Sequence, residues 1–159
     1  MTNYPCIDQL LPHDKPMILI DRALDIQQDT IHCQVEISAS NPFFNSNSQT
    51  IPAYVGIEFM AQSVAAWSGY HAMQRNEEPP IGFLLGSRRY ASDIDMFAQG
   101  QLLDIYAEKM MEDNGMAVFK AHIELEQQQI ASCQLNVYVP SPEKLQEMKI
   151  RSQQWPDKS

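Results

Sequence analysis

The chain of 159 residues lacks the features that mark membrane-spanning, secreted and nucleic-acid-binding proteins. It has no run of about 18 apolar residues, the length that crosses a bilayer as a helix. Its first residues lack the basic start and the apolar stretch of a secretory signal. It has 11 lysines and arginines against 20 acidic residues, and the resulting net charge of −9 disfavours phosphate-rich partners. We therefore expect a cytoplasmic protein with no membrane insertion and no nucleic-acid partner.

Cysteine is also scarce. Cys6, Cys33 and Cys133 are far apart in the sequence and show none of the spacings of metal sites. Three cysteines cannot all pair with one another, so free thiols in a reducing compartment are the simplest interpretation. We expect neither a metal nor a redox cofactor.

Length and composition predict one domain. A chain of this size can bury a substantial core, and a hydrophobic content of 44% is typical of globular proteins. The segments with clear hydrophobic patterns all lie within residues 1–140, whereas residues 141–159 are polar. We expect one domain over residues 1–140 and a polar C-terminal extension over residues 141–159.

The hydrophobic pattern predicts two strands, one long helix and then four strands. Residues 30–38 alternate between apolar and polar positions, as in a half-buried strand. Pro52 suits the first turn of a helix, and Pro79-Pro80 would end it. Residues 113–115 (DNG) are a strong hairpin signal, and residues 127–129 (QQQ) are a weaker one. The expected elements are a short helix at 5–11, strands at 17–26 and 30–38, a loop at 38–51, a helix at 52–74, and strands at 81–90, 102–112, 117–127 and 130–139.

The expected helix carries two polar residues in an otherwise apolar start. Residues 51–62 read IPAYVGIEFMAQ, with Glu58 and Gln62 one helical turn apart. A helix that is apolar on nearly all sides is usually buried, and ionisation is costly in such surroundings. We therefore expect Glu58 to lie in a desolvated functional site. The alternative is a structural carboxylate that is hydrogen-bonded to a loop.

One helix must cover about six strands. The strands after the helix are joined by short connections, which favours antiparallel pairing. We therefore expect an α+β fold in which a curved antiparallel sheet wraps around one central helix.

Three segments resemble one enzyme family. Residues 11–22 (LPHDKPMILIDR) and 51–62 resemble the N-terminal motif and the helix start of 3-hydroxyacyl-acyl-carrier-protein dehydratases. With residues 81–90 (IGFLLGSRRY), they look most like the dehydratase-like branch of aryl polyene biosynthesis clusters. The similarity spans residues 7–140. It implies the hotdog fold, which the order of elements permits, and a dimer that acts on thioesters held by the phosphopantetheine of a carrier protein. It implies no other cofactor.

The resemblance also implies roles for particular groups. In the family, a loop histidine takes the proton alpha to the thioester, and the helix carboxylate, here Glu58, protonates the departing hydroxyl. Backbone N–H groups at the helix start polarise the thioester carbonyl.

This chain departs from the pattern at the loop. Residues 42–53 (PFFNSNSQTIPA) contain no histidine, are three residues shorter than the family's loop, and have Ala53 in place of a glycine. His13 is then the nearest candidate for a replacement base, although such a histidine more often fixes its own segment. The strand pattern places His32 and His122 on solvent-facing sides.

Four further residues, Phe43, Phe44, Ala53 and Gly56, are candidates for substrate binding. Phe43 and Phe44 would line an acyl tunnel or, alternatively, pack in the core. Gly56 would let an acyl chain approach the helix, although tight packing of the helix on the sheet explains a glycine equally well.

Gln62 and an arginine pair complete the candidate residues. Gln62 would orient Glu58 or bind substrate, or else satisfy buried backbone groups. Arg88 and Arg89 stand out in an acidic chain and would contact the acidic carrier protein, or else form salt bridges within the chain.

The leading interpretation is dehydration of a 3-hydroxyacyl thioester, with Glu58 as the acid. One alternative is a non-catalytic acyl-binding subunit that pairs with an active dehydratase. Another is a hotdog thioesterase, in which the helix carboxylate activates water. The assembly would be a homodimer or a heterodimer with a dehydratase paralogue.

Overall fold

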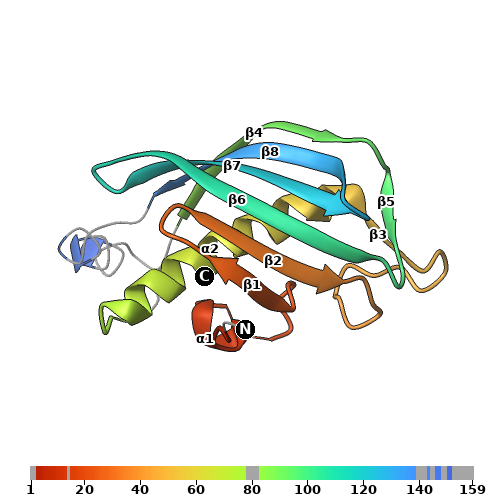
Figure 1. The fold of residues 1–159 in the computed structure, drawn as a ribbon, viewed down its shortest axis with the longest axis horizontal. Helices are drawn as coiled ribbons and strands as arrows, with labels where there is room; N and C mark the ends of the chain where they lie inside the picture. Colours follow the sequence, from red (N-terminus) through yellow and green to blue (C-terminus); the bar gives the residue numbers. More distant parts are fainter. Residues whose placement is uncertain are drawn as a thin grey trace.

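A six-stranded antiparallel sheet curls around one long helix in the computed structural model (Figure 1). The structure describes residues 3–13, 15–77 and 83–138 and five positions between 143 and 151; for residues 83–85 it describes only the backbone. The described elements are α1 (Ile7–Leu10), β1 (Arg22–Ile26), β2 (Thr30–Glu36), β3 (Thr50–Pro52), the 3-10 helix η1 (Ala53–Val55), α2 (Gly56–Gln74), β4 (Phe83–Ser92), β5 (Met96–Ala98), β6 (Leu102–Asp113), β7 (Met116–Leu125) and β8 (Gln128–Tyr138).

The order of strands in the sheet is β1-β2-β6-β7-β8-β4, and every neighbouring pair is antiparallel. The strands before and after α2 therefore end up at opposite sides of one sheet. This arrangement confirms the predicted α+β hotdog fold. The boundary expected at residue 140 falls outside the described residues and stays a prediction.

The core lies between α2 and the inner face of the sheet. On β2, the apolar residues Ile31, Cys33 and Val35 are buried, whereas the residues between them are more exposed. The same alternation on β6, β7 and β8 places one apolar face of the sheet against the helix. The side chains of Phe59 and Phe97 meet in this core, with ring centroids 5.8 Å apart.

The long helix has the predicted end points, with a tighter first turn. Residues 53–55 form a 3-10 turn and the α-helix then runs from Gly56 to Gln74. Asn76 has a φ of 58°, and the Glu77 N–H donates to the Ala72 carbonyl. This left-handed cap ends the helix before the prolines at 79 and 80 are reached. No described helix is both long and apolar enough to cross a membrane.

Two hairpins connect the last three strands. The β6–β7 turn has Asn114 at φ 51° and Gly115 at φ 83°, as the sequence predicted for a two-residue turn of this type. The β7–β8 turn was predicted at residues 127–129 but lies at Glu126 and Gln127, which have φ values of 53° and 68°. The difference arises because Leu125 pairs with Gln128, so the strand begins two residues earlier than expected.

Three expectations about the strands were wrong. The strand expected over residues 17–26 begins only at Arg22, because the backbone of Met17 and Leu19 is bonded to a helix side chain instead of to a strand. Residues 38–51 form the predicted loop only as far as Thr50, where β3 starts. The short pair of β3 and β5 was not predicted, since three-residue strands are too short to show alternation.

Gly69 is the closest contact between α2 and the N-terminal segment. A Cβ at this position would lie 1.8 Å from the Leu10 carbonyl oxygen. The absence of a side chain therefore lets the end of α1 rest directly on the helix.

We predict that Gly69→Ala destabilises the protein by about 1–3 kcal/mol in urea unfolding, because the methyl group overlaps backbone atoms. Alanine is otherwise favoured over glycine in a helix by about 1 kcal/mol, so the steric effect must reverse the usual sign. Gly86→Ala is the matched control, because a Cβ there meets nothing within 4 Å. Unchanged or increased stability of Gly69→Ala would contradict the packing described.

Candidate functional site at the start of the central helix

The start of the central helix is fixed by both polar groups of the Ala53 peptide unit. The Ala53 N–H donates to the Asp95 carbonyl at 3.0 Å, and the Ala53 carbonyl accepts a hydrogen bond from the Tyr90 hydroxyl. These bonds tie the helix start to β4 and to the segment that precedes β5. The backbone at the position where the family has a glycine is therefore held by the fold itself.

Gly56 is explained by the Tyr90 side chain. A Cβ on Gly56 would lie 3.0 Å from the Tyr90 hydroxyl oxygen and 3.2 Å from the Ile123 side chain. Burial raises the pKa of Tyr90 above its ordinary value, so the hydroxyl stays protonated and donates a hydrogen bond to the Ala53 carbonyl. The sequence analysis did not identify Tyr90; the signal for it was the small residue at position 56.

Glu58 is exposed, contrary to the expectation of a desolvated carboxyl group. The helix is apolar, but in the single chain one of its faces is not covered. Tyr54, one turn earlier, is 66% exposed, and Ala61 and Ala65 on the following turns are only half-buried. Glu58 makes no hydrogen bond or ion pair with any residue that the structure describes, so the alternative of a carboxylate bonded to a loop is not observed.

Gln62 faces the core although it lies one turn after Glu58. Its side chain is 1% exposed. Its Oε1 accepts a hydrogen bond from the Leu19 N–H at 2.8 Å, and its Nε2 donates to the Met17 carbonyl at 2.7 Å. Gln62 therefore satisfies backbone groups of the N-terminal segment, one of the three roles that the sequence suggested. An amide engaged in this way positions residues 17–19 along the helix.

The structure does not bring His13 to Glu58. Along the chain, His13 lies between Leu10, which rests against Gly69, and Met17, which bonds to Gln62. The segment between these two contacts runs from the Gly69 position of α2 to the Gln62 position. His13 is half-buried, and its Nδ1 has no hydrogen-bond partner among the described residues. Within the described chain, no histidine is hydrogen-bonded to Glu58.

The two loop phenylalanines differ in their surroundings. Phe44 is half-buried and packs against the core, whereas Phe43 is 38% exposed. Side-chain oxygens shape this loop: the Asn41 Oδ1 accepts a hydrogen bond from the Phe43 N–H at 2.8 Å, and the Asn45 Oδ1 accepts one from the Asn47 N–H at 2.9 Å. The loop is thus held in a compact form without the missing family residues.

Arg88 and Arg89 are exposed on β4, which is an edge strand of the sheet. A bulge between Arg88 and Ala91 interrupts the pairing of β4 with β8, and Arg89 has a φ of 56° there. Neither arginine forms an ion pair with the described part of the chain. The alternative of an intramolecular salt bridge is therefore not observed.

The thiols are not placed for nucleophilic chemistry. Burial raises the pKa of Cys33 to about 12 and that of Cys133 to about 11, so both stay protonated near neutral pH. Cys6 is exposed and lies just before α1. Among the described residues, no group of three or more histidine, cysteine, aspartate or glutamate side chains is placed to hold a metal ion.

Comparisons with known proteins agree with the geometry. The model of the ApeP-like family, described as ApeP dehydratase, matches residues 5–149. A chain of the dehydratase heterocomplex ApeI:P from Xenorhabdus doucetiae is 31% identical, with a TM-score of 0.84, and the match covers 92% of this chain and 98% of that one.

More distant relatives were also found. The 3-hydroxyacyl-[acyl-carrier-protein] dehydratase FabZ of Vibrio campbellii is 28% identical over 135 residues, which are 81% of this chain and 87% of the relative. A hypothetical thioesterase with coenzyme A from Streptococcus pneumoniae has a TM-score of 0.58 at 10% identity and covers 74% of this chain and 86% of that one. This last likeness shows the fold alone.

We predict that Gln62→Leu lowers the free energy of unfolding by about 2–4 kcal/mol, because two backbone groups at residues 17 and 19 lose their partner. Amide hydrogen exchange at Leu19 should accelerate at the same time. Gln74→Leu is the matched control, since Gln74 is exposed at the end of the same helix. An unchanged exchange rate at Leu19 would refute the positioning role of Gln62.

Proposed function

Because the chain belongs to the ApeP-like dehydratase family, we propose that it is a subunit of a 3-hydroxyacyl-carrier-protein dehydratase in which Glu58 is the catalytic acid. The observation that supports this role is the position of Glu58, which lies exposed and unpaired on the uncovered face of α2. A substrate can reach a carboxyl group in this position. A carboxyl group that was paired within the fold could not donate its proton freely.

The proposed reaction removes water from carbons 2 and 3 of the acyl group. A base takes the proton from the carbon next to the thioester carbonyl, and the C–H electrons form the new double bond. The C–O bond at carbon 3 breaks, and Glu58 gives its proton to the departing oxygen, which leaves as water. Glu58 is then a carboxylate and recovers a proton when the base is deprotonated again.

We propose that the base comes from outside this chain. The loop before α2 contains no histidine, and His13 lies on the segment that runs from the Gly69 position of the helix to the Gln62 position. We propose that a second, dehydratase-like chain supplies it. The chain of the ApeI:P heterocomplex that is 31% identical to this one supports pairing with a paralogue. Glu58 and the partner's base would then form one composite site.

The surface next to Glu58 fits such a partner. Strand β4 has ten residues and lies at the edge of the sheet, so the backbone groups on its outer side are free to pair with another strand. Tyr54, Ala61 and Ala65 on the same side of α2 would be covered in that arrangement. Burial beside a partner would remove water from Glu58, and the neutral acid is favoured over the carboxylate where water is excluded.

We propose that Arg88 and Arg89 contact the carrier protein. Arg88 on β4 lies directly opposite Gln134 on β8, so the two side chains point outward from the same face of the sheet. If a partner strand paired with the edge of β4, Arg88 would still be on the surface. Neither guanidinium group makes an ion pair with a residue that the structure describes, and an acidic partner would otherwise be repelled by the net charge of −9. The substrate would arrive on the phosphopantetheine arm of this carrier.

A second candidate function is that of a non-catalytic acyl-binding subunit. One observation favours it: the Ala53 N–H already donates to the Asp95 carbonyl at 3.0 Å, so it is not free to polarise a thioester carbonyl. In this case the partner would carry out the dehydration within its own site. The two functions differ in whether Glu58 is needed.

We predict that the co-purified complex of this chain with its paralogue converts a 3-hydroxyacyl carrier thioester to the enoyl form, measured as loss of water by mass spectrometry. Glu58→Gln should slow this reaction at least about a hundredfold, because the amide cannot act as an acid. Glu36→Gln, at an exposed position, is the matched control.

The products separate the remaining functions. An unchanged rate for Glu58→Gln in an intact complex would assign the non-catalytic role to this chain. Release of a free carrier thiol without the enoyl product would identify a thioesterase.

We predict that Arg88→Gln and Arg89→Gln together weaken binding of the acyl carrier protein about tenfold, and that binding then depends less on salt concentration. Fluorescence anisotropy with a labelled carrier measures both effects. Arg75→Gln is the control, because the Arg75 guanidinium is exposed and already paired with Glu77 at 3.2 Å. Equal losses for the control and the double variant would argue against a carrier contact at β4.

A further inference from the structure

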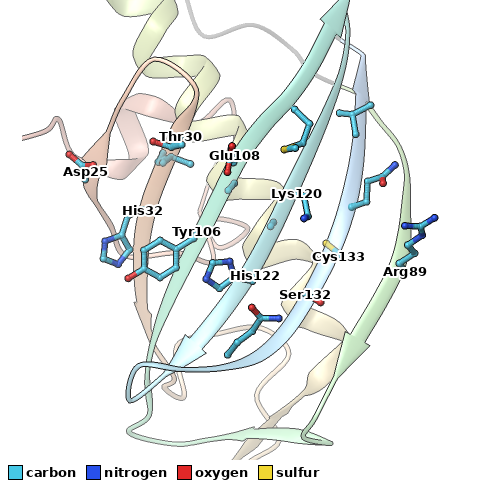
Figure 2. A pocket seen from close by; sticks show the side chains of 17 residues that line it. Asp25, Thr30, His32, Arg89, Tyr106, Glu108, Lys120, His122, Ser132 and Cys133 are labelled. Carbon is cyan, nitrogen blue, oxygen red and sulfur yellow. The ribbon is translucent and has the colours of Figure 1, made fainter.

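The outer face of the sheet, which faces away from α2, is hollowed. A cleft of about 980 Å³ lies over strands β2, β6, β7, β8 and β4 (Figure 2). The side chains that shape it alternate with the buried residues of the same strands, so they point away from the core. This cleft is separated from Glu58 by the sheet, and of the residues that line it only Arg89 has a part in the proposed function.

Three rings stand in a row across the floor of this cleft. His32, Tyr106 and His122 are direct partners on β2, β6 and β7, and Figure 2 shows them side by side. The ring of Tyr106 is stacked on both histidines, with centroids 4.2 Å from His32 and 4.9 Å from His122 and interplanar angles of 16° and 15°. The sequence placed the two histidines on solvent-facing sides but gave no sign of the stack.

Carboxylates hold the two outer rings. The Nε2 of His32 is 2.8 Å from the Asp104 Oδ1, and the Nε2 of His122 is 2.8 Å from the Glu124 Oε2. These contacts use the edge of each imidazole ring and leave its faces free for stacking. The ring stack is therefore a preorganised surface.

The stack stops at β8 because the next position is small. Ser132 is the direct partner of His122, and its hydroxymethyl group does not cover the imidazole face that points toward β8. Neighbouring strands are about 4.8 Å apart, which matches the spacing between the stacked rings. A planar ring placed over Ser132 would continue the stack by one member.

The charges in the cleft are divided between its two sides. Asp25 and Glu108 lie on the side of β1 and β6, whereas Lys120 and Arg89 lie on β7 and β4, on either side of Ser132 (Figure 2). Neither cation makes an ion pair within the described residues. A negative group on a ring over Ser132 would lie between the strand that carries Lys120, whose direct strand partner is Glu108, and the strand that carries Arg89.

We propose that the outer face of the sheet binds a planar aromatic anion, with its ring stacked on His122 over Ser132 and its carboxylate or phosphate beside Lys120 and Arg89. The ring requirement comes from the interrupted stack, and the charge requirement comes from Lys120 and Arg89, neither of which makes an ion pair with a described residue. The site does not depend on Glu58 or on the dehydration reaction.

The test is an NMR titration of the full chain with 2-naphthoate. A ring that stacks on His122 should shift the His122 ring protons and the Ser132 amide upfield, and the shifts should saturate. Cyclohexanecarboxylate has the charge but no aromatic ring, and 2-naphthalenemethanol has the ring but no charge; each should bind at least about tenfold more weakly. Adenosine monophosphate replaces the carboxylate with a phosphate and distinguishes these two sources of charge.

Two variants address the ring position. Ser132→Phe would fill the gap with a side chain of the protein and should abolish the response to 2-naphthoate while keeping the fold, since an aromatic pair across strands stabilises a sheet. Asn136→Phe is the matched control, because Asn136 lies on the same strand and pairs with Val118, away from the rings. It should leave the response unchanged.

Lys120→Gln tests the charge and should weaken binding of 2-naphthoate about five- to tenfold. Four results would overturn the proposal. These are an absence of shifts, equal binding of cyclohexanecarboxylate, an undiminished response of Ser132→Phe, or shifts that depend on protein concentration without ligand. The last result would show that a second copy of the chain covers this face.

Discussion

A single long helix must bury the inner face of six strands in the described part of the chain, and the shape of the molecule follows from this limit. A flat sheet of this width would leave most of its apolar face in water. The strands therefore curl around α2, and every inward side chain of the central strands reaches the helix or its neighbours. The same limit leaves one side of the helix uncovered, because the sheet surrounds it only in part.

The uncovered side gives the chain its functional character. Glu58 lies there, exposed, whereas Gln62 on the next turn is sealed in the core by its bonds to residues 17 and 19. The helix start itself is rigid, since Tyr90 and Asp95 hold both polar groups of Ala53. A carboxyl group on an open surface beside the edge strand β4 fits half of the proposed site. A partner that covers this side would complete the proposed dehydratase.

The sequence predicted those features of the site that depend on residues close together in the chain, and it missed those that depend on residues far apart. The DNG turn and the ends of α2 are local features, and their prediction was correct. The helix that carries Glu58 is also where the motif predicted it. The exposure of Glu58 was not predicted, because apolar neighbours in the sequence do not show which side of a helix is left uncovered. Tyr90 was missed because its partner, Ala53, is 37 residues away.

By itself, the sequence determined the class of fold, the family and the position of the carboxylate on the central helix. These follow from hydrophobic periods and short motifs, which are properties of neighbouring residues. Only the tertiary structure decided that Gln62 serves the backbone, and that His32, Tyr106 and His122 form one stack. Strand register sets the ring stack, and the bonds of Gln62 join the helix to residues 17 and 19, so both depend on contacts between segments that are distant in the chain.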